Sequence, residues 1–241
     1  MKIEGKNAVR EALKAGKTIN ALYVSKDTND NMVKSLIRLA REQKIKVTYC
    51  DKFYLNKISE SKAHQGIIAE SVDFNYSELQ EILDVAIVKN QPNFIVILDG
   101  IEDPHNLGAI IRTCECAGVH GIIIPNRRAC PVNETVIKTS AGAAEHMKIC
   151  MVTNINQTID TLKKQNIWVY GIELGGTDLF KANLQGNIAL VIGSEGNGIS
   201  KLTKEKCDGI LTMSMYGQVN SLNASVAAGI SIFEVLKQRN V

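Results

Sequence analysis

From residue 94 onward the chain alternates short apolar runs with segments of helical periodicity. The expected strands are Phe94–Leu98, Gly121–Ile124, Met147–Val152, Trp168–Ile172, Ala189–Ile192 and Ile210–Met213. The expected helices are Asn106–Ala117, Asn133–Ala144, Thr158–Gln165, a short one from Ser200, and a last one from about Asn223 to Arg239. Near-continuous apolar strands separated by helices are typical of a mostly parallel sheet covered on both faces. The pattern predicts an α/β fold that binds ligands beyond the carboxyl ends of its strands.

The first 72 residues form a separate and smaller α/β pattern. Helices are expected at Asn7–Ala15 and Asn31–Gln43, and strands at Ala21–Ser25, Lys46–Cys50 and Gln65–Glu70. The pattern loosens after Ser71, where only a short helix at Ser77–Val88 is expected. We therefore predict domains at residues 1–72 and 93–241, joined by a linker at residues 73–92.

Charge divides along the same line. Residues 1–72 hold 14 Lys and Arg against 8 Asp and Glu, whereas the remainder holds 14 against 17. A basic module joined to a mildly acidic one is typical of a front half that meets a polyanion, although a solvated lysine-rich surface is the alternative. No run approaches the roughly 18 apolar residues of a membrane span, and the first residues carry no apolar signal core. We expect a cytoplasmic protein with no membrane contact.

The six cysteines and four histidines have no metal-ligand spacing. No CxxC pair occurs, and Cys114 and Cys116 lie two apart on an expected helix, so they point in different directions. Buried thiols in a reducing compartment are the expected state, and no metal is predicted.

Two loops rich in glycine, asparagine and serine follow two of the last strands. Gly193–Gly198 follows Ile188–Ile192, and Gly217–Asn223 follows Ile210–Met213. Glycine leaves backbone amides and carbonyls open to a ligand, so the two loops are expected to wall one pocket. The first loop lacks the dinucleotide fingerprint, and a helix-entry turn is its alternative interpretation. Glu195, set between glycines, is expected to cap a helix or to accept hydrogen bonds from a ligand or partner loop.

Polar residues at two helix starts are further candidates. Asn106 stands where an N-cap is expected, ahead of an apolar stripe. Arg112 is predicted to lie on the side of Gly108, where the helix surface is bare, and to grip a phosphate or carboxylate. An ordinary surface arginine is the alternative. Ser221 or Asn223 is expected to cap the last helix, whose mouth favours anions.

Three blocks taken together resemble the SpoU (TrmH-like) branch of the SPOUT superfamily, the knotted RNA ribose 2′-O-methyltransferases. They are Asn106–Thr113, Ile192–Gly198 and Asn220–Ser225, in this order. Gly5–Val9 and His64–Ala69 look like the L30e-like RNA-binding module of the subgroup that methylates a guanosine of large-subunit (23S) rRNA. The resemblance covers nearly the whole chain.

The resemblance implies a deep trefoil knot in the C-terminal parallel-sheet domain, and a homodimer. It also implies S-adenosylmethionine as the cofactor, with Gly193, Met213 and Leu222 presenting backbone groups to its adenine and ribose. Ile192 and Gly198 belong to the same cofactor-binding loops.

The implied chemistry is methyl transfer to a ribose 2′-hydroxyl of RNA. The family assigns activation of that hydroxyl to the residue matching Arg112. Because guanidinium scarcely loses its proton, we expect Arg112 to orient a phosphate and stabilise developing negative charge. Asn106, Glu195, Ser221 and Asn223 are expected to position Arg112 and the ribose. A tRNA ribose methyltransferase, a non-catalytic RNA-binding protein and, more weakly, a nicotinamide-dependent dehydrogenase are the alternatives.

Overall fold

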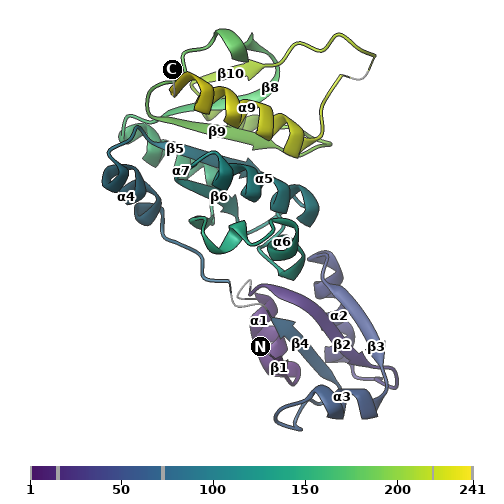
Figure 1. The fold of residues 1–241 in the computed structure, drawn as a ribbon. Helices are drawn as coiled ribbons and strands as arrows, with labels where there is room; N and C mark the ends of the chain where they lie inside the picture. The colour runs from purple at the N-terminus through teal and green to yellow at the C-terminus, as the bar shows by residue number, and fades with distance from the viewer. Residues whose placement is uncertain (1, 15–16, 72–73, 219, 240–241) are drawn as a thin grey trace. The chain divides into compact units, whose positions relative to one another are not determined.

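The computed structural model describes residues 2–14, 17–71, 74–218 and 220–239 of the 241-residue chain. The chain divides into two compact units, Met1–Asn75 and Tyr76–Val241 (Figure 1). The predicted boundary between residues 72 and 73 and the predicted helix end at Ala15 lie outside the described residues.

The described residues of unit 1 form a four-stranded sheet with three helices. Its elements are β1 (Lys2–Glu4), α1 (Lys6–Lys14), β2 (Ile19–Ser25), α2 (Asn31–Glu42), β3 (Lys46–Cys50), α3 (Lys52–Ile58) and β4 (Ile67–Ser71). The sheet order is β1-β4-β2-β3, with β4 antiparallel to β1 and β2, and β3 parallel to β2. Alternate side chains of β4 enter two cores: Ile67 and Ala69 pack with α1 and α2, whereas Ile68 packs with Leu55 of α3. The structure confirms the predicted elements and adds β1 and α3.

Unit 2 is built on a six-stranded parallel sheet. Its strands are β5 (Phe94–Asp99), β6 (Gly121–Pro125), β7 (Ile149–Val152), β8 (Trp168–Asp178), β9 (Ile188–Gly193) and β10 (Gly209–Thr212). The order is β10-β8-β9-β5-β6-β7, and every neighbouring pair is parallel. The predicted parallel α/β fold is therefore confirmed.

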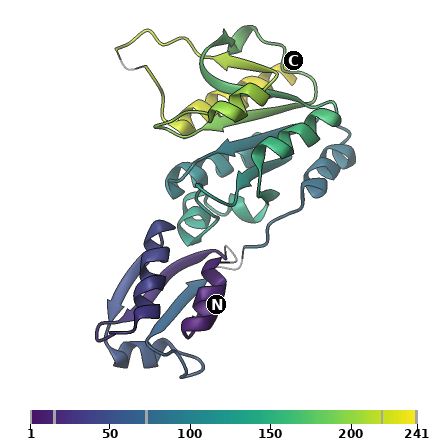
Figure 2. The ribbon, with the colours of Figure 1, turned by 180° about the vertical axis from the view of Figure 1, so that it is seen from behind.

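Helices cover both faces of this sheet. The helices of unit 2 are α4 (Leu79–Lys89), α5 (Pro104–Cys116), α6 (Glu134–Thr139), α7 (Ile155–Lys164), α8 (Lys201–Lys206) and α9 (Ala224–Arg239). Figure 1 shows α5 and α9 on the near face, and Figure 2, from behind, shows α4 and α7 on the other. Ile82 of α4 and Ile159 of α7 belong to one core with Ile95 and Ile97 of β5. Among the described helices, none is long and apolar enough to span a lipid bilayer.

The helix predicted at Asn133–Ala144 is shorter than expected. It ends at Thr139 because Ala141 and Gly142 take left-handed backbone angles, with φ of 52° and 86°. These angles are incompatible with a continuing right-handed helix. A 3₁₀ turn at Ala143–Glu145 follows.

Candidate active site

Three loops of unit 2 begin at one edge of the sheet. Because β5, β9 and β10 run in the same direction, the segments that follow Asp99, Gly193 and Thr212 all leave from the carboxyl ends. The pairing of Asp99 with Gly193 places the first two loops beside each other. This is the edge where ligands bind in open α/β sheets.

Side chains from all three predicted blocks meet in one cluster. The amide of Asn223 donates from Nδ2 to Oδ1 of Asn106 at 3.0 Å and to Oε2 of Glu195 at 3.4 Å. The Nδ2 of Asn106 donates to the same Glu195 oxygen at 3.4 Å. Asn106 is buried and Glu195 is exposed. The Glu195 carboxylate therefore accepts hydrogen bonds from the protein at one oxygen and remains open to solvent. We call these three residues the polar cluster.

Asn106 is not the N-cap of its helix, which corrects the sequence prediction. The cap of α5 is Asp103, whose carboxylate accepts from the backbone N–H groups of His105 at 3.2 Å and Asn106 at 3.1 Å. Pro104 occupies the first turn, where its missing N–H is not needed. The Asn106 side chain is thereby free to bind Glu195 and Asn223.

Asn223 caps α9. The sequence predicted that either Ser221 or Asn223 would do so. Its Oδ1 accepts from the backbone N–H of Ser225 at 2.9 Å, from that of Val226 at 3.4 Å, and from the Ser225 hydroxyl at 2.6 Å. One side chain thus fixes the start of α9 and, through Nδ2, the polar cluster. Ser221 is exposed and makes no such bond within the described residues.

The Gly193–Gly198 loop closes on itself. Ser194 and Gly198 exchange backbone hydrogen bonds of 3.0 and 2.9 Å. A Cβ on Gly193 would lie 2.2 Å from the carbonyl carbon of Gly198, so only glycine permits this approach. The loop is not a helix-entry turn, because α8 begins only at Lys201 with Ser200 as its cap residue.

Two carboxylates hold the far side of this loop. Asp99 accepts from the backbone N–H of Ser200 at 2.8 Å. Glu173 accepts from the backbone N–H of Ile199 at 3.1 Å and from Nζ of Lys204 at 2.6 Å. Sequence reasoning missed Glu173; its one signal is a carboxylate interrupting an apolar strand just ahead of two glycines.

Arg112 stands apart from the polar cluster. Its side chain is exposed on α5, and no hydrogen bond or ion pair joins it to another described residue. The prediction of a bare helix surface beside Gly108 is wrong. Gly108 is buried under α6, where an added Cβ would lie 2.0 Å from Oγ1 of Thr139. The absence of a side chain at residue 108 serves helix packing, not a ligand groove.

The residues expected to bind a cofactor lie on the two glycine loops or at the ends of the strands that lead into them. Ile192 and Gly193 end β9 and are buried, and Gly198 contacts Gly193 through its backbone. Met213 directly follows β10 and is buried, whereas Leu222 is half-buried beside Asn223. Within the described part of the chain, no group of three or more His, Cys, Asp or Glu residues is arranged to hold a metal ion.

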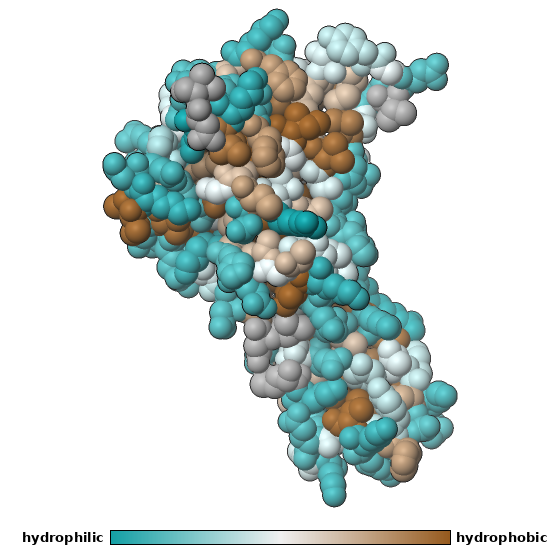
Figure 3. Space-filling view, viewed as in Figure 1, coloured by the Kyte–Doolittle hydropathy of each residue, from teal (hydrophilic) through white to brown (hydrophobic). Residues whose placement is uncertain are grey.

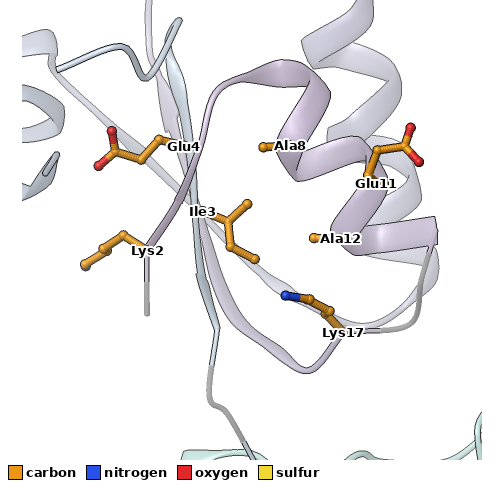
Figure 4. Close-up of a pocket in the computed structure, with 7 residues that line it drawn as sticks. All are labelled: Lys2, Ile3, Glu4, Ala8, Glu11, Ala12 and Lys17. Carbon is orange, nitrogen blue, oxygen red and sulfur yellow. The ribbon is translucent and has the colours of Figure 1, made fainter. Parts of the chain in front are cut away.

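A shallow cavity of about 450 Å³ lies in unit 1, between β1 and α1 (Figure 4). Ile3 points from the strand toward Ala8 and Ala12 of the helix, whereas Lys2 and Glu4 point to the opposite side of β1. The lining carries two lysines and two glutamates with no nucleophile or metal set, so we assign it no chemistry.

The two N-terminal motifs, Gly5–Val9 and His64–Ala69, are joined by hydrogen bonds. The backbone N–H of Lys6 donates to the Gln65 side chain at 3.2 Å, and that of Gly5 to the carbonyl of Ile67 at 3.2 Å. Buried His64 accepts from the N–H of Gly66 at 3.0 Å and pairs with Asn56 at 3.0 Å. Gly5 and Gly66 take φ of 88° and 82°, which explains why glycine stands at both positions.

Comparison with known families identifies the family to which this protein belongs. The model of the SpoU rRNA Methylase family matches residues 93–233, which include the whole polar cluster. The chain belongs to the SpoU rRNA methylase family. A second family model, RNA 2′-O ribose methyltransferase substrate binding, matches residues 2–77. The resemblance drawn from the three blocks is confirmed.

Two bacterial relatives match over nearly their full length. A Bacillus subtilis (strain 168) protein named as a TrmH family tRNA/rRNA methyltransferase, YacO, is 43% identical over 238 residues, covering 98% of this chain and 95% of its own. A Staphylococcus saprophyticus protein of the same family name is 40% identical over 239 residues, covering 99% and 96%.

Solved structures share the fold. The SpoU methyltransferase AviRb from Streptomyces viridochromogenes, in complex with AdoMet, has a TM-score of 0.64 at 21% identity, covering 100% of this chain and 90% of its own. The AdoMet-bound rRNA methyltransferase from Sinorhizobium meliloti has a TM-score of 0.58 at 24% identity, covering 98% and 86%. At these identities the likeness concerns the fold.

Proposed function

We propose that this SpoU family protein transfers a methyl group from S-adenosylmethionine to a ribose 2′-hydroxyl of RNA, at a guanosine of 23S rRNA. The observation that carries the proposal is the polar cluster. Asn106 and Asn223 lie 117 residues apart in sequence, yet their amides and the Glu195 carboxylate meet at the carboxyl edge of the sheet. A core needs no polar cluster that opens to solvent at Glu195, whereas a substrate ribose needs hydrogen-bond partners held in place.

The chemical groups on the two glycine loops suit S-adenosylmethionine. A Cβ on Gly196 or Gly217 would meet no described atom within 4 Å, so both loops present open backbone. Ile192 and Met213 supply buried apolar surface beside them, which suits an adenine ring. The proposal assigns cofactor binding to Gly193, Met213 and Leu222 through backbone groups, with Ile192 and Gly198 shaping the loops. When bound, the cofactor supplies an electrophilic methyl group.

The chain's own residues handle the ribose. A 2′-hydroxyl is a weak nucleophile, so the negative charge that develops on its oxygen needs stabilisation. Arg112 is an exposed guanidinium without an ion pair among the described residues, which suits it to an RNA phosphate and to this charge. Asn106, Glu195 and Asn223 position the ribose, and Ser221 lies on the same loop as Asn223.

Unit 1 supplies the RNA-binding part of the proposal. Its residues match the substrate-binding family model, and residues 1–72 carry six more basic than acidic side chains. Relatives carry names that include both tRNA and rRNA, so a tRNA ribose is the alternative substrate. RNA as substrate and the buried thiols of Cys50, Cys114 and Cys150 favour the cytoplasm as the site of action.

The proposal includes a homodimer and the trefoil knot of the family. Val226, Ile230 and Phe233 form an outward stripe on α9 at helical spacing, with exposed fractions of 49%, 37% and 49%. Figure 3 shows apolar side chains gathered over this helix. A second copy would remove this stripe from water.

Radiolabelled methyl transfer tests the proposal. The purified protein is incubated with methyl-labelled S-adenosylmethionine and, in parallel, with large-subunit rRNA or bulk tRNA. We expect label in rRNA at one position. Label in tRNA alone would overturn the substrate, and cofactor binding with no transfer to either RNA would favour a non-catalytic RNA-binding protein.

A further inference from the structure

Unit 1 exposes two neighbouring aromatic side chains on α3. Phe53 is 78% exposed and Tyr54 is 40% exposed, whereas Leu55, the next residue, is fully buried in the small core beneath the helix. Leu55 and the partly buried Ile58 anchor α3, so the aromatic pair is not needed to fill that core. Large exposed rings beside each other are uncommon on a surface unless something binds there.

The ring of Tyr54 is held in place from one side. It lies 6.0 Å from the ring of Tyr23, centroid to centroid, at an interplanar angle of 48°. Tyr23 donates its hydroxyl to Glu70 at 3.0 Å, and Nζ of Lys2 lies 5.4 Å above its ring while pairing with Glu70 at 3.1 Å. Tyr54 therefore presents its outer face from an ordered support.

Phe53 has no comparable support. Among the described residues no aromatic ring pairs with it, and it points away from the core that holds Leu55. Lys57 lies one turn further along α3 on the same side, and Lys52 directly precedes Phe53. Both lysines are exposed and neither forms an ion pair with a described residue. Two open rings thus share one short helix with two exposed lysines that form no ion pair with a described residue.

We propose that Phe53 and Tyr54 form a stacking platform for unpaired bases of the RNA substrate, with Lys52 and Lys57 contacting the adjoining phosphates. The inference rests on the proposed function. RNA is the occupant because the surface combines aromatic faces with positive charge in a basic unit that matches an RNA substrate-binding family. Unpaired nucleotides are specified because the bases of a duplex have no free face to stack.

Binding of large-subunit rRNA by single variants tests the platform. We expect Phe53→Ala and Tyr54→Ala each to raise the Kd for rRNA about tenfold, the range of one lost stacking contact. Phe53→Trp keeps a stacking face and is expected to retain native affinity. Ile87→Ala is the matched control, because Ile87 is an apolar side chain of unit 2 that is 72% exposed. An unstructured RNA oligomer is expected to compete better than a fully paired hairpin of equal length.

Three results would overturn the platform: unchanged affinity of Phe53→Ala, equal loss in Phe53→Trp and Phe53→Ala, or better competition by the paired hairpin. Altered self-association of Phe53→Ala with unchanged RNA affinity would assign the surface to a second copy instead. Methyl transfer is scored separately. A native protein that binds unpaired RNA through Phe53 yet transfers no methyl would contradict the proposed function and leave the platform standing.

Discussion

At the scale of single residues, the Glu195 carboxylate is the meeting point of two amides from distant parts of the chain. One of them, Asn223, also caps α9, so a single side chain links helix stability to the candidate site. This double use makes the two contributions separable by substitution.

Asn223→Ala removes both contributions, and Asn223→Asp removes one. We expect Asn223→Ala to lower the free energy of unfolding by about 1 kcal/mol, the usual cost of a lost N-cap, and to abolish methyl transfer. Asn223→Asp keeps the cap oxygen but loses the amide donor and sets a second carboxylate beside Glu195. We expect native-like thermal stability with strongly reduced transfer. Equal activity of Asn223→Asp and the native protein would contradict the role of the cluster.

Arg112 is predicted to act on the RNA and not on the cofactor. Arg112→Lys keeps the charge but loses the planar fork that binds phosphate in two places. Label transfer is expected to fall to nearly nothing, while the Kd for S-adenosylmethionine measured by calorimetry stays at the native value. Retained turnover would remove Arg112 from the account.

Glu4 gives a prediction about pH. Partial burial opposes its ionisation, but hydrogen bonds from the Ser61 hydroxyl, the Glu60 N–H, the Ser59 hydroxyl and the Ser61 N–H lower its pKa from 4.5 to about 2. A lowered pKa means that the stabilisation is present above pH 4.5 and is lost as pH falls toward 2. Hydrogen exchange of the backbone amides at residues 59–64 measures this stabilisation. We expect Glu4→Gln to open this segment more readily at pH 5.5 and to converge with the native protein toward pH 2. A difference independent of pH would contradict the assignment.

At the scale of helices and strands, close packing explains the glycine at residue 108 of α5 but not the one at residue 229 of α9. A Cβ on Gly108 of α5 would lie 2.0 Å from Thr139, whereas one on Gly229 of α9 would lie 3.9 Å from Thr113, an ordinary contact. Gly108→Ala is expected to lower the free energy of unfolding by about 1–3 kcal/mol through overpacking. Gly229→Ala is expected to raise it by about 0.5–1 kcal/mol through backbone entropy. Urea unfolding of both variants checks the pair, and a stable Gly108→Ala would show that α6 can move.

Burial and length explain why most helices and strands were predictable from the sequence and some were not. Strand β9 is buried along its whole length and β5 along all but its last residue, so both appear in the sequence as continuous apolar runs. In contrast, α3 buries only Leu55 and β1 has three residues, so neither leaves a periodic pattern. The early end of α6 depends on left-handed angles at Ala141 and Gly142, and alanine gives no signal for such a conformation.

The polar cluster was predictable as residues but not as geometry. Asn106, Glu195 and Asn223 were singled out from the three blocks, yet their contacts with one another and the support from Glu173 depend on how β8 and α5 meet the loops. The cap role of Asp103 is local, because its carboxylate accepts from residues 105 and 106, and Pro104 directly after it is a sequence signal for a helix start. The contacts within the polar cluster and those of Glu173 span 26 to 117 residues in sequence, and local patterns carry no information on them.

At the scale of the whole molecule, the exposed stripe on α9 predicts self-association. Phe233→Glu places a charge in the proposed interface and is expected to convert a dimer into a monomer in sedimentation analysis. Phe180→Glu is the matched control, since Phe180 is 54% exposed elsewhere in unit 2. A native monomer, or a dimer that survives Phe233→Glu but not Phe180→Glu, would contradict the assignment of the stripe.

The proposed function requires methyl transfer to a ribose oxygen. The most direct measurement is mass spectrometry of nucleosides from large-subunit rRNA treated with the native protein and S-adenosylmethionine. We predict one added methyl on the sugar fragment of guanosine, with the base fragment unchanged and no gain in RNA treated with Arg112→Lys. A methyl found on the base fragment would contradict the account, as would RNA that gains no methyl at all.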